Sequence, residues 1–293
     1  MTSKAGGAPR PFRLPMRHFH CGRYRLSLVR PLVMGIVNLT PDSFSGDGLV
    51  GDVDRAIEHA RLQMAAGADI LDIGAESSRP GAIPTPVDEE LRRLLPVLEE
   101  ITAWGVPVSV DTYKPSVMHA ALTAGAAMIN DITGMSQSEA LAVVAGSDCG
   151  ICLMHMRGEP GTMQQAPHYR DVLGEVRGFL AAALARCRAA AIVDERVVLD
   201  PGFGFGKSLE HNLLLFRQMS QTAVDGLPLL VGVSRKSMLG AITGRSVGER
   251  LPASLAAAVL AADKGAKILR VHDVAATRDA LAVWAAIEQG SDQ

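Results

Sequence analysis

Short apolar runs alternate with longer Ala- and Leu-rich segments along most of this chain. From Pro31 onward, each apolar run is rich in β-branched residues, stops at a polar or glycine-containing turn, and precedes a segment with helical spacing. The runs predict strands at 32–39, 68–73, 107–110, 126–132, 150–154, 196–199, 227–233 and 266–271. Strands that alternate with helices are typical of parallel sheets built from βαβ units.

The segments between the strands predict helices at 52–66, 87–104, 115–124, 171–191, 209–220, 253–264 and 276–288. Gly67, Gly105, Gly125 and Gly265 each stand directly before a predicted strand, where a left-handed residue commonly ends a helix. Eight βα units without a Pro- or Ser-rich linker predict an α/β fold, a single closed (β/α)8 TIM barrel. An open doubly wound sheet is the alternative, but such sheets usually have fewer strands.

The first 30 residues lie outside this pattern. Residues 1–19 predict a flexible N-terminal tail, and 20–30 alternate loosely enough for a short hairpin extension across the bottom of the barrel. The barrel domain is therefore expected over 20–290. Arginines interrupt the N-terminal segment, so we expect neither a signal peptide nor a membrane span there.

Composition narrows the class of partner. A chain of 293 residues that is 48% hydrophobic can bury one large core or two modest ones. Its formal net charge of -2 provides no general basic field for nucleic acid or anionic lipid. We therefore expect a cytoplasmic enzyme that acts on small-molecule substrates, with neither nucleic acid nor membrane as a partner.

The four cysteines, Cys21, Cys149, Cys152 and Cys187, predict buried apolar side chains rather than disulfides. Cys149 and Cys152 form a CxxC, which is also found in redox pairs and in zinc sites. They lie in an apolar run that predicts a strand, where residues three apart face opposite sides. The core interpretation is therefore preferred.

Polar side chains stand where the apolar runs stop. In chain order they are Asn38, Asp72, Asp111, Asn130, His155, Asp200, Ser234, Arg235, Lys236, Arg270 and His272. Taken singly, most such residues are helix caps or turn residues. Their coincidence at all eight strand ends predicts an active site at the C-terminal face of the barrel.

These residue types indicate the kind of ligand. Asp111, Asn130 and Asp200 offer acceptors suited to a flat heterocycle with N–H donors, such as a pterin or a purine. A second set supplies cations and N–H donors suited to phosphate oxygens, namely Arg79, Lys236, Arg270 and His272. The other half of the ligand is therefore expected to be phosphorylated.

The glycine-rich segment 201–208 does not match either common nucleotide-binding motif. In 201–208 the first glycine of a P-loop would fall on Pro201, and the dinucleotide pattern fails because Lys207 stands three residues after Gly204. The polar loops 40–48 and 76–81 are either mobile lids over the barrel or plain βα connections.

Eight motifs together resemble those of the dihydropteroate synthases. They are 34–45, 72–81, 109–115, 129–132, 153–156, 200–207, 234–238 and 270–274, in order across residues 31–280. The combination of Asp-Pro-Gly-Phe-Gly-Phe-Gly-Lys with Ser-Arg-Lys-Ser is highly specific. The resemblance implies a transferase of folate biosynthesis, which joins 6-hydroxymethyl-7,8-dihydropterin pyrophosphate to p-aminobenzoate and releases pyrophosphate.

The resemblance also implies roles for particular residues. It assigns pterin binding to Asp111, Asn130, Met154, Asp200, Phe205 and Lys236. It assigns p-aminobenzoate binding to Ser77, Ser78, Arg79, Pro80, Phe205 and Ser237. It implies that Ser237 binds the carboxylate at a helix N-terminus, where free N–H groups favour an anion. Pyrophosphate would contact Arg79, Arg270 and His272, and a Mg2+ cofactor would bind Asn38. The implied catalytic set is Asn38, Lys236, Arg270 and His272.

Three positions depart from the usual family pattern. Gly46-Asp47 stands where the family has Asp-Gly, Ala75 where it has Gly, and Ser78 where it has Thr. The resemblance implies that pyrophosphate leaves before the arylamine attacks, so no protein nucleophile is needed. A homodimer is expected through the Ala- and Leu-rich segments 181–184 and 253–262, and sulfonamides, as mimics of p-aminobenzoate, are candidate inhibitors.

The sequence leaves two other functions open. One is a pterin-binding methyltransferase domain on the same barrel, which would lack the Ser234–Ser237 aminobenzoate site. The other is a non-catalytic pterin-binding protein, which pyrophosphate release on mixing both substrates would exclude.

Overall fold

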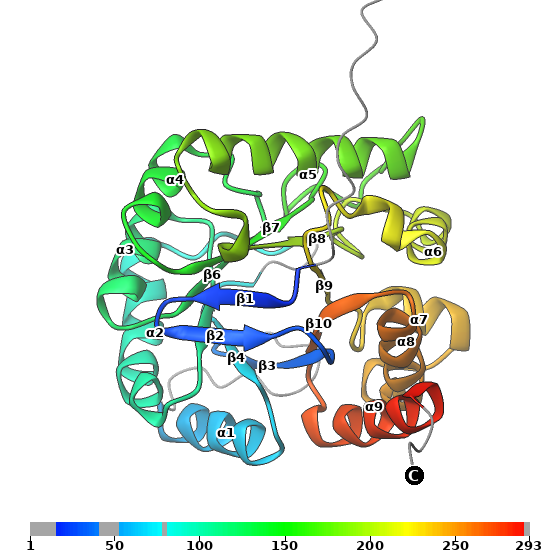
Figure 1. Ribbon diagram of the computed structural model, residues 1–293, viewed down its shortest axis with the longest axis horizontal. Coiled ribbons are helices and arrows are strands. Elements are labelled where there is room, and N and C mark those ends of the chain that lie inside the picture. Colours follow the sequence, from blue (N-terminus) through cyan, green and yellow to red (C-terminus); the bar gives the residue numbers. More distant parts are fainter. Residues whose placement is uncertain (1–15, 41–52, 78–80, 290–293) are drawn as a thin grey trace, which may run out of the picture.

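Eight parallel strands close into a barrel at the centre of the molecule (Figure 1). The computed structural model describes residues 16–40, 53–77 and 81–289. Around the barrel the strands follow the order β10-β3-β4-β5-β6-β7-β8-β9, which is chain order with the last strand closing on the first. Their bounds are β3 Leu32–Asn38, β4 Ile70–Gly74, β5 Val108–Asp111, β6 Met128–Asp131, β7 Gly150–Met154, β8 Val197–Asp200, β9 Leu229–Val231 and β10 Ala266–Val271. The predicted TIM barrel is confirmed.

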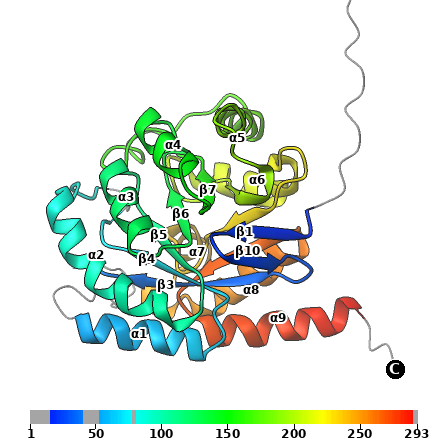
Figure 2. The same cartoon turned by 60° about the vertical axis from the view of Figure 1, so that its left-hand side comes forward.

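Helices cover the outside of the barrel, as the view in Figure 2 also shows. They are α1 Val53–Ala65, α2 Val87–Ile101, α3 Pro115–Thr123, α4 Ser138–Ala145, α5 Val172–Ala189, α6 Leu209–Arg217, α7 Ser237–Thr243, α8 Leu251–Asp263 and α9 Val274–Gln289. Short 3-10 turns lie at η1 Thr102–Trp104, η2 Asp194–Arg196, η3 Met219–Thr222 and η4 Val247–Glu249. The predicted left-handed glycines are confirmed, because Gly67, Gly105, Gly125 and Gly265 all have positive φ.

Alternation along each strand divides the buried residues into two layers. Val33, Val37 and Leu71 belong to the large apolar cluster between strands and helices. Met34, Ile70 and other residues on the opposite strand faces form a smaller cluster inside the barrel. This period of two also decides which polar residues can reach the interior farther along the same strands.

A β-hairpin closes the bottom of the barrel, at the N-terminal ends of its strands. It consists of β1 His18–Cys21 and β2 Tyr24–Ser27, and it crosses in front of the barrel in Figure 1. Phe19 and Cys21 are fully buried and join the cluster inside the barrel. At Gly150 a Cβ atom would come within 2.5 Å of the Phe19 ring, so this close packing requires a glycine. The predicted hairpin is present and begins two residues earlier than expected, whereas residues 1–15 of the expected tail lie outside the described residues.

The cysteine pattern follows the two layers. Cys149 packs in the outer cluster and Cys152 in the inner one, and all four thiols are free and buried. The core interpretation of the CxxC is confirmed, because its two side chains face opposite sides of β7. Among the described residues no helix is long and apolar enough to cross a membrane.

Candidate active site

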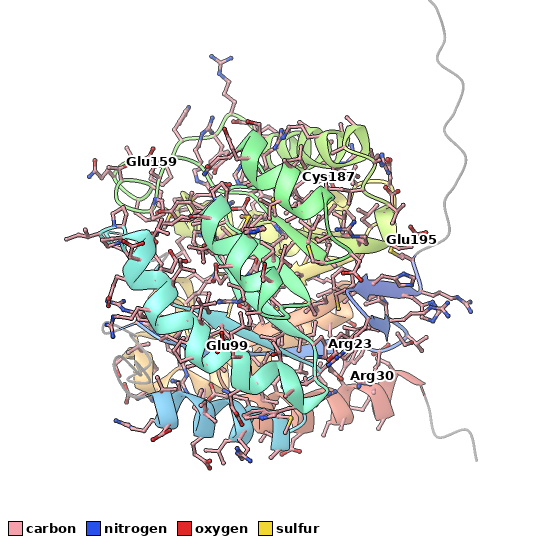
Figure 3. All side chains as sticks on the ribbon, turned by 90° about the vertical axis from the view of Figure 1, so that its left-hand side faces the viewer. Arg23, Arg30, Glu99, Glu159, Cys187 and Glu195 are labelled. Carbon is pink, nitrogen blue, oxygen red and sulfur yellow. The ribbon has the colours of Figure 1, made fainter. Side chains whose placement is uncertain are left out.

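Polar side chains point into the barrel just above the apolar side chains that fill its lower part. Ile70, Met128 and Val198 fill the interior, and the residues two positions later are Asp72, Asn130 and Asp200. Because the side chains of a strand alternate, these polar groups face the same interior. Above them lies a cavity of about 470 Å³ at the C-terminal ends of the strands. In Figure 3 Glu159, from the loop after β7, lies on the opposite side of the molecule from Arg23 and Arg30 near the hairpin.

The predicted site residues occupy three kinds of place. Those that line the cavity are Asn38, Ser77, Asp111, Phe205, Lys236, Ser237, Arg270 and His272. Asn130, Met154 and Asp200 do not line it; they are at most 5% exposed, in the barrel interior. Ser78, Arg79 and Pro80 lie outside the described residues, as do the departures at Gly46-Asp47 and Ser78. Ala75 is described and is buried.

Arg270 of β10 links two carboxylates from neighbouring strands. Its Nε donates to Asp72 Oδ2 at 2.6 Å, and its Nη2 donates to Asp111 Oδ2 at 2.8 Å. Burial raises the pKa of Asp111, and the Arg270 guanidinium opposes that shift. The carboxylates in turn hold the pKa of Arg270 above its ordinary value, although burial acts in the opposite direction. A fixed positive charge thus lies at the floor of the cavity.

Several buried acceptors around Arg270 have capacity left for a ligand. Within the described residues, Asp72 Oδ1, Ser109 Oγ and Asn130 Oδ1 are buried and have no hydrogen-bond partner. They come from the consecutive strands β4, β5 and β6, and Asp72 is in register with Ser109. Since buried polar atoms are nearly always paired, such a cluster marks a site for hydrogen-bond donors from outside the chain.

Lys236 brings a second cation to the cavity. Its Nζ donates to the backbone oxygen of Phe203 and lies 4.6 Å from the centre of the Phe205 ring. Burial lowers the pKa of Lys236 to about 8, and the carboxylates of Asp200 and Asp111 partly offset this effect. The ammonium form therefore predominates at neutral pH.

The turn before Lys236 is held from both sides. Arg235 has a φ of 56°, which is unfavourable for a residue with a side chain. Its N–H donates to Ser254 Oγ at 2.9 Å, and its carbonyl oxygen accepts from Arg250 Nη1 at 3.0 Å. Its guanidinium pairs with Asp273 at 2.6 Å. These contacts fix the backbone that directs Lys236 into the cavity and begins α7 at Ser237.

The turn after β8 is held by a buried lysine that sequence reasoning missed. Lys207 is 3% exposed and donates from Nζ to the backbone oxygens of Gly202 at 2.7 Å and Phe205 at 3.1 Å. Asp200 Oδ1 accepts from the Gly202 N–H at 2.7 Å. Burial lowers the pKa of Lys207 to about 7, and Asp200 opposes the shift. The P-loop comparison gives Lys207 no role, but its place at the end of a glycine-rich turn is a signal of this one.

His155 is the exception among the polar strand-end residues. The expectation that it would share the cavity with the others is wrong, because it faces the helix layer. Its ring packs against Phe179 with centroids 5.0 Å apart, and its Nδ1 lies 3.0 Å from Lys207 Nζ. Burial lowers the pKa of His155 to about 3, so the ring is neutral. Met154 precedes it on the inward face, and alternation along β7 therefore predicts an outward His155.

The rim offers donors for an anion and few ligands for a metal. Asn38 and His272 both line the cavity, and His272 Nδ1 lies 3.0 Å from Ser234 Oγ. In the described ranges no group of three or more His, Cys, Asp and Glu could hold a metal ion. Mg2+ commonly takes one or two protein oxygens and completes its coordination with waters and substrate phosphates. The Asn38 amide oxygen fits an ion that binds in this way.

Comparisons with known proteins agree with this geometry. The profile of a family described as pterin binding enzyme matches residues 34–272. The dihydropteroate synthase of Neisseria meningitidis serogroup B is 48% identical over 279 residues, which are 92% of this chain and 98% of that protein. The chain thus belongs to the pterin-binding enzymes, a class that fits a barrel with buried acceptors below a cationic cavity.

Solved structures narrow the class to one family. The dihydropteroate synthase of Burkholderia cenocepacia, complexed with 7,8-dihydropteroate, is 48% identical with a TM-score of 0.87 and covers 95% of this chain and 99% of its own. That of Xanthomonas albilineans with 4-aminobenzoic acid is 48% identical with a TM-score of 0.86 and covers 93% and 98%. Within the pterin-binding enzymes, this chain belongs to the dihydropteroate synthase family.

Proposed function

We propose that this chain condenses 6-hydroxymethyl-7,8-dihydropterin pyrophosphate with p-aminobenzoate, giving 7,8-dihydropteroate and pyrophosphate. The observation that carries the proposal is the cluster of unpaired acceptors at Asp72, Ser109 and Asn130 beside the Arg270 and Lys236 cations. Acceptors below and cations above suit a ligand with N–H donors at one end and phosphate groups at the other. The Burkholderia complex with 7,8-dihydropteroate supports the same class of ligand.

The pterin ring would bind deepest. Its amino and ring N–H groups would donate to Asp111, Asn130 and Asp200, of which Asn130 is in register with Asp111 on the neighbouring strand. Met154 and the Phe205 ring would provide apolar contact. Arg270 Nη2 donates to Asp111 Oδ2. Because a carboxylate accepts several hydrogen bonds, a bound pterin can donate to Asp111 while that ion pair stays in place.

The pyrophosphate would bind at the cationic side. Arg270 and His272 line the cavity there, and the family role of Arg79 lies outside the described residues. Asn38 would hold a Mg2+ ion, which would supply charge neutralisation for the departing pyrophosphate. Fixed cations near a leaving group act in a site shielded from water, where their effect on the reaction barrier is larger than in solution.

The aminobenzoate would lie near Ser77, between Phe205 and Lys236, with its carboxylate towards Ser237. In the reaction the carbon–oxygen bond to pyrophosphate breaks, the amine nitrogen bonds to the methylene carbon, and the amine loses a proton. We propose that the bond to pyrophosphate breaks first, because an arylamine is a weak nucleophile. Phe205 and the Lys236 stem would hold the amine and carbon in line, so the chain supplies position and charge rather than a covalent intermediate.

Two alternatives are distinguished by the site itself. A pterin-binding methyltransferase would not need an aminobenzoate site at Lys236 and Ser237, and both residues line the cavity here. A non-catalytic pterin-binding protein would bind the pterin and form no product. Mass spectrometry of a mixture of enzyme, both substrates and Mg2+ tests the proposal: dihydropteroate should form, and its absence after prolonged incubation would refute it.

We propose that the chain forms a homodimer through α6, α7 and α8, and not through the expected segment of α5. Ala183 and Leu184 of the expected α5 segment are buried in the core, whereas Leu214 of α6, Ile242 of α7 and Leu260 of α8 are exposed. α7 contacts both α6 and α8, so these three helices lie on one side of the molecule (Figure 1). We place the contact between copies there. A cytoplasmic location is likewise proposed, and the free thiols fit a reducing compartment.

A further inference from the structure

A nearly buried lysine lies behind the mouth of the cavity, in a cluster that the proposed reaction does not use. Lys114 directly precedes α3, and its side chain is 13% exposed. Its Nζ donates to Glu90 Oε2 at 2.6 Å, to a carboxylate oxygen of Glu76 and to the backbone oxygen of Thr85. The Tyr113 hydroxyl donates to the other oxygen of Glu76 at 2.7 Å. One ammonium therefore gathers groups from separate parts of the chain.

These groups mark the two ends of one loop. Glu76 follows β4 by two residues, Thr85 precedes α2 by two residues, and Glu90 lies in the first turn of α2. Lys114 thus joins the start of the β4–α2 loop to its end. Arg93 of α2 adds a contact at the start, where its Nη1 donates to the Ala75 backbone oxygen at 3.3 Å.

Charge makes the cluster depend on the lysine. Burial raises the pKa of Glu90, and Lys114 opposes that shift. Burial acts to lower the pKa of Lys114, but its bonds to Glu76 and Glu90 raise it overall. Lys114 is therefore charged at neutral pH. Without it, Glu90, which is 1% exposed, would face Glu76 with no cation between them, and breaking a buried pair in this way is costly.

The loop that Lys114 holds contributes to the cavity. Glu76 and Ser77 both line it, and the other side of the loop is attached through the Gly81 N–H, which donates to the Pro160 oxygen at 3.0 Å. We infer that Lys114 is a positioning residue: by holding both ends of the β4–α2 loop it keeps Ser77 at the cavity mouth and sets the affinity for the aminobenzoate. The inference rests on the proposed function, in which the aminobenzoate binds beside Ser77.

Steady-state kinetics of Lys114→Met test the inference. The KM for p-aminobenzoate should rise about tenfold, since misplacing a positioning group by about 1 Å can cost up to ~100-fold. The KM for the pterin substrate and kcat should change much less, because Lys114 does not line the cavity. Lys114→Arg keeps the charge and should recover most of the affinity. Equal rises in both KM values would indicate general loosening and overturn the inference.

A matched control and a second variant keep the test independent of folding. Arg30→Met breaks the 2.6 Å ion pair with Asp69 near the hairpin, on the side of the molecule opposite Glu159 (Figure 3), and should leave both KM values unchanged. Glu76→Gln removes the charge only at the start of the loop and should raise the aminobenzoate KM less than Lys114→Met does. An aminobenzoate KM unchanged in both cluster variants would overturn the inference and leave the proposed function intact.

Hydrogen exchange provides a readout without substrates. Amides in residues 81–90 should exchange faster in Lys114→Met than in the unsubstituted chain, and Arg30→Met should not change them. If the unsubstituted chain forms no dihydropteroate, the proposed function fails and takes the aminobenzoate part of the inference with it. If the amides of residues 81–90 exchange at the same rate in Lys114→Met as in the unsubstituted chain, Lys114 does not hold the loop and the rest of the inference fails as well.

Discussion

At the scale of single residues, Lys236 owes its place to its neighbours. Arg235 before it adopts a left-handed backbone, and Ser254 and Arg250 of the neighbouring chain segment bind both sides of that residue. The side chain then extends over Phe205, where burial weakens its hold on a proton. An ammonium fixed in this way can act on a ligand without the cost of reorganising at the moment of reaction.

Replacing Lys236 should therefore affect catalysis far more than folding. Lys236→Ala should lower kcat/KM by about 10²–10³, the usual effect of removing one preorganised electrostatic group. Its free energy of unfolding should stay close to that of the unsubstituted chain, because a partly desolvated charge is removed along with its contacts. Lys264→Ala, just after α8, is the matched control and should leave the rate unchanged. Normal turnover in Lys236→Ala would contradict the assignment.

The pH dependence should report the same lysine. Its pKa in the folded chain is about 8, so the ammonium is present below that pH and is lost as the pH rises through it. We therefore expect kcat/KM to fall above about pH 8. Lys236→Arg keeps its charge in this range and should move the descending limb to higher pH, even if its rate is lower. An unchanged limb near pH 8 in Lys236→Arg would assign it to another group.

The alternation of residues along the strands predicted which acceptor side chains lie inside the barrel. It did not predict which donors they pair with. Asp72, Asn130 and Asp200 follow interior residues by two positions, so alternation alone brings them into the barrel. The same rule excludes His155 from the cavity, because His155 follows the inward-facing Met154 by one residue. Pairings such as Arg270 with Asp72 and Asp111 could not be predicted, because they depend on how the barrel brings β10, β4 and β5 together.

At the scale of elements, the turn after β8 shows how backbone shape supports the site. Asp200 and Lys207 bind the backbone of this turn from two sides, and the Phe205 side chain between them reaches the cavity. Gly202 has a φ of 70°, and a Cβ atom there would meet the His155 backbone oxygen at 1.8 Å. Neither the turn nor β7 can move without displacing residues proposed to bind the pterin.

Gly202→Ala and Gly244→Ala form a matched pair at this scale. Both glycines have a φ of 70°, but a Cβ at Gly244 would meet no atom within 4 Å. Gly244→Ala should cost about 1–2 kcal/mol of unfolding free energy, the price of the left-handed backbone alone. Gly202→Ala should cost about 3 kcal/mol or more and lower activity as well, because overpacking is added to the backbone strain. Denaturant unfolding checks the difference, and equal losses would show that the contact with His155 is unimportant.

Periodicity located the long elements and missed the short ones. α5 and α9 each extend over several turns, and their apolar spacing was visible in the sequence. α4 and α7 have eight and seven residues, too few for a helical period to stand out from a loop. α7 matters, because it begins at Ser237, directly beside the Lys236 cation. Periodicity did not find this helix, whereas the family resemblance implied a helix N-terminus at Ser237.

At the scale of the whole molecule, the barrel separates stability from function. The hairpin and the cluster inside the barrel, which includes Phe19 and Met34, fill the N-terminal end of the barrel. The cavity and its charged side chains occupy the C-terminal end. The sequence predicted this division through the order of its βα units. It could not predict the oligomeric state. The contact between copies depends on which apolar side chains remain exposed, and this is known only once the helices are packed on the barrel.

Light scattering on a sizing column tests the proposed dimer. The unsubstituted chain should elute with twice the chain mass of 30.9 kDa. Leu260→Arg, on the exposed side of α8, should shift it towards the single-chain mass, because a charge cannot be buried unpaired between copies. Val283→Arg places the same charge on the exposed side of α9 and should leave the mass unchanged. A single-chain mass before any substitution would refute the dimer.

The central claim is that one cavity joins a pterin pyrophosphate to an arylamine, and pyrophosphate release measures this most directly. With both substrates and Mg2+, the chain should release one pyrophosphate for each dihydropteroate formed. Omitting p-aminobenzoate should abolish dihydropteroate and slow turnover, because the methylene cation left by pyrophosphate then has no amine to trap it. Release should fall sharply in Lys236→Ala and be lost when EDTA removes the divalent cation that Asn38 is proposed to hold. No pyrophosphate release with both substrates present, or release without formation of dihydropteroate, would contradict the account.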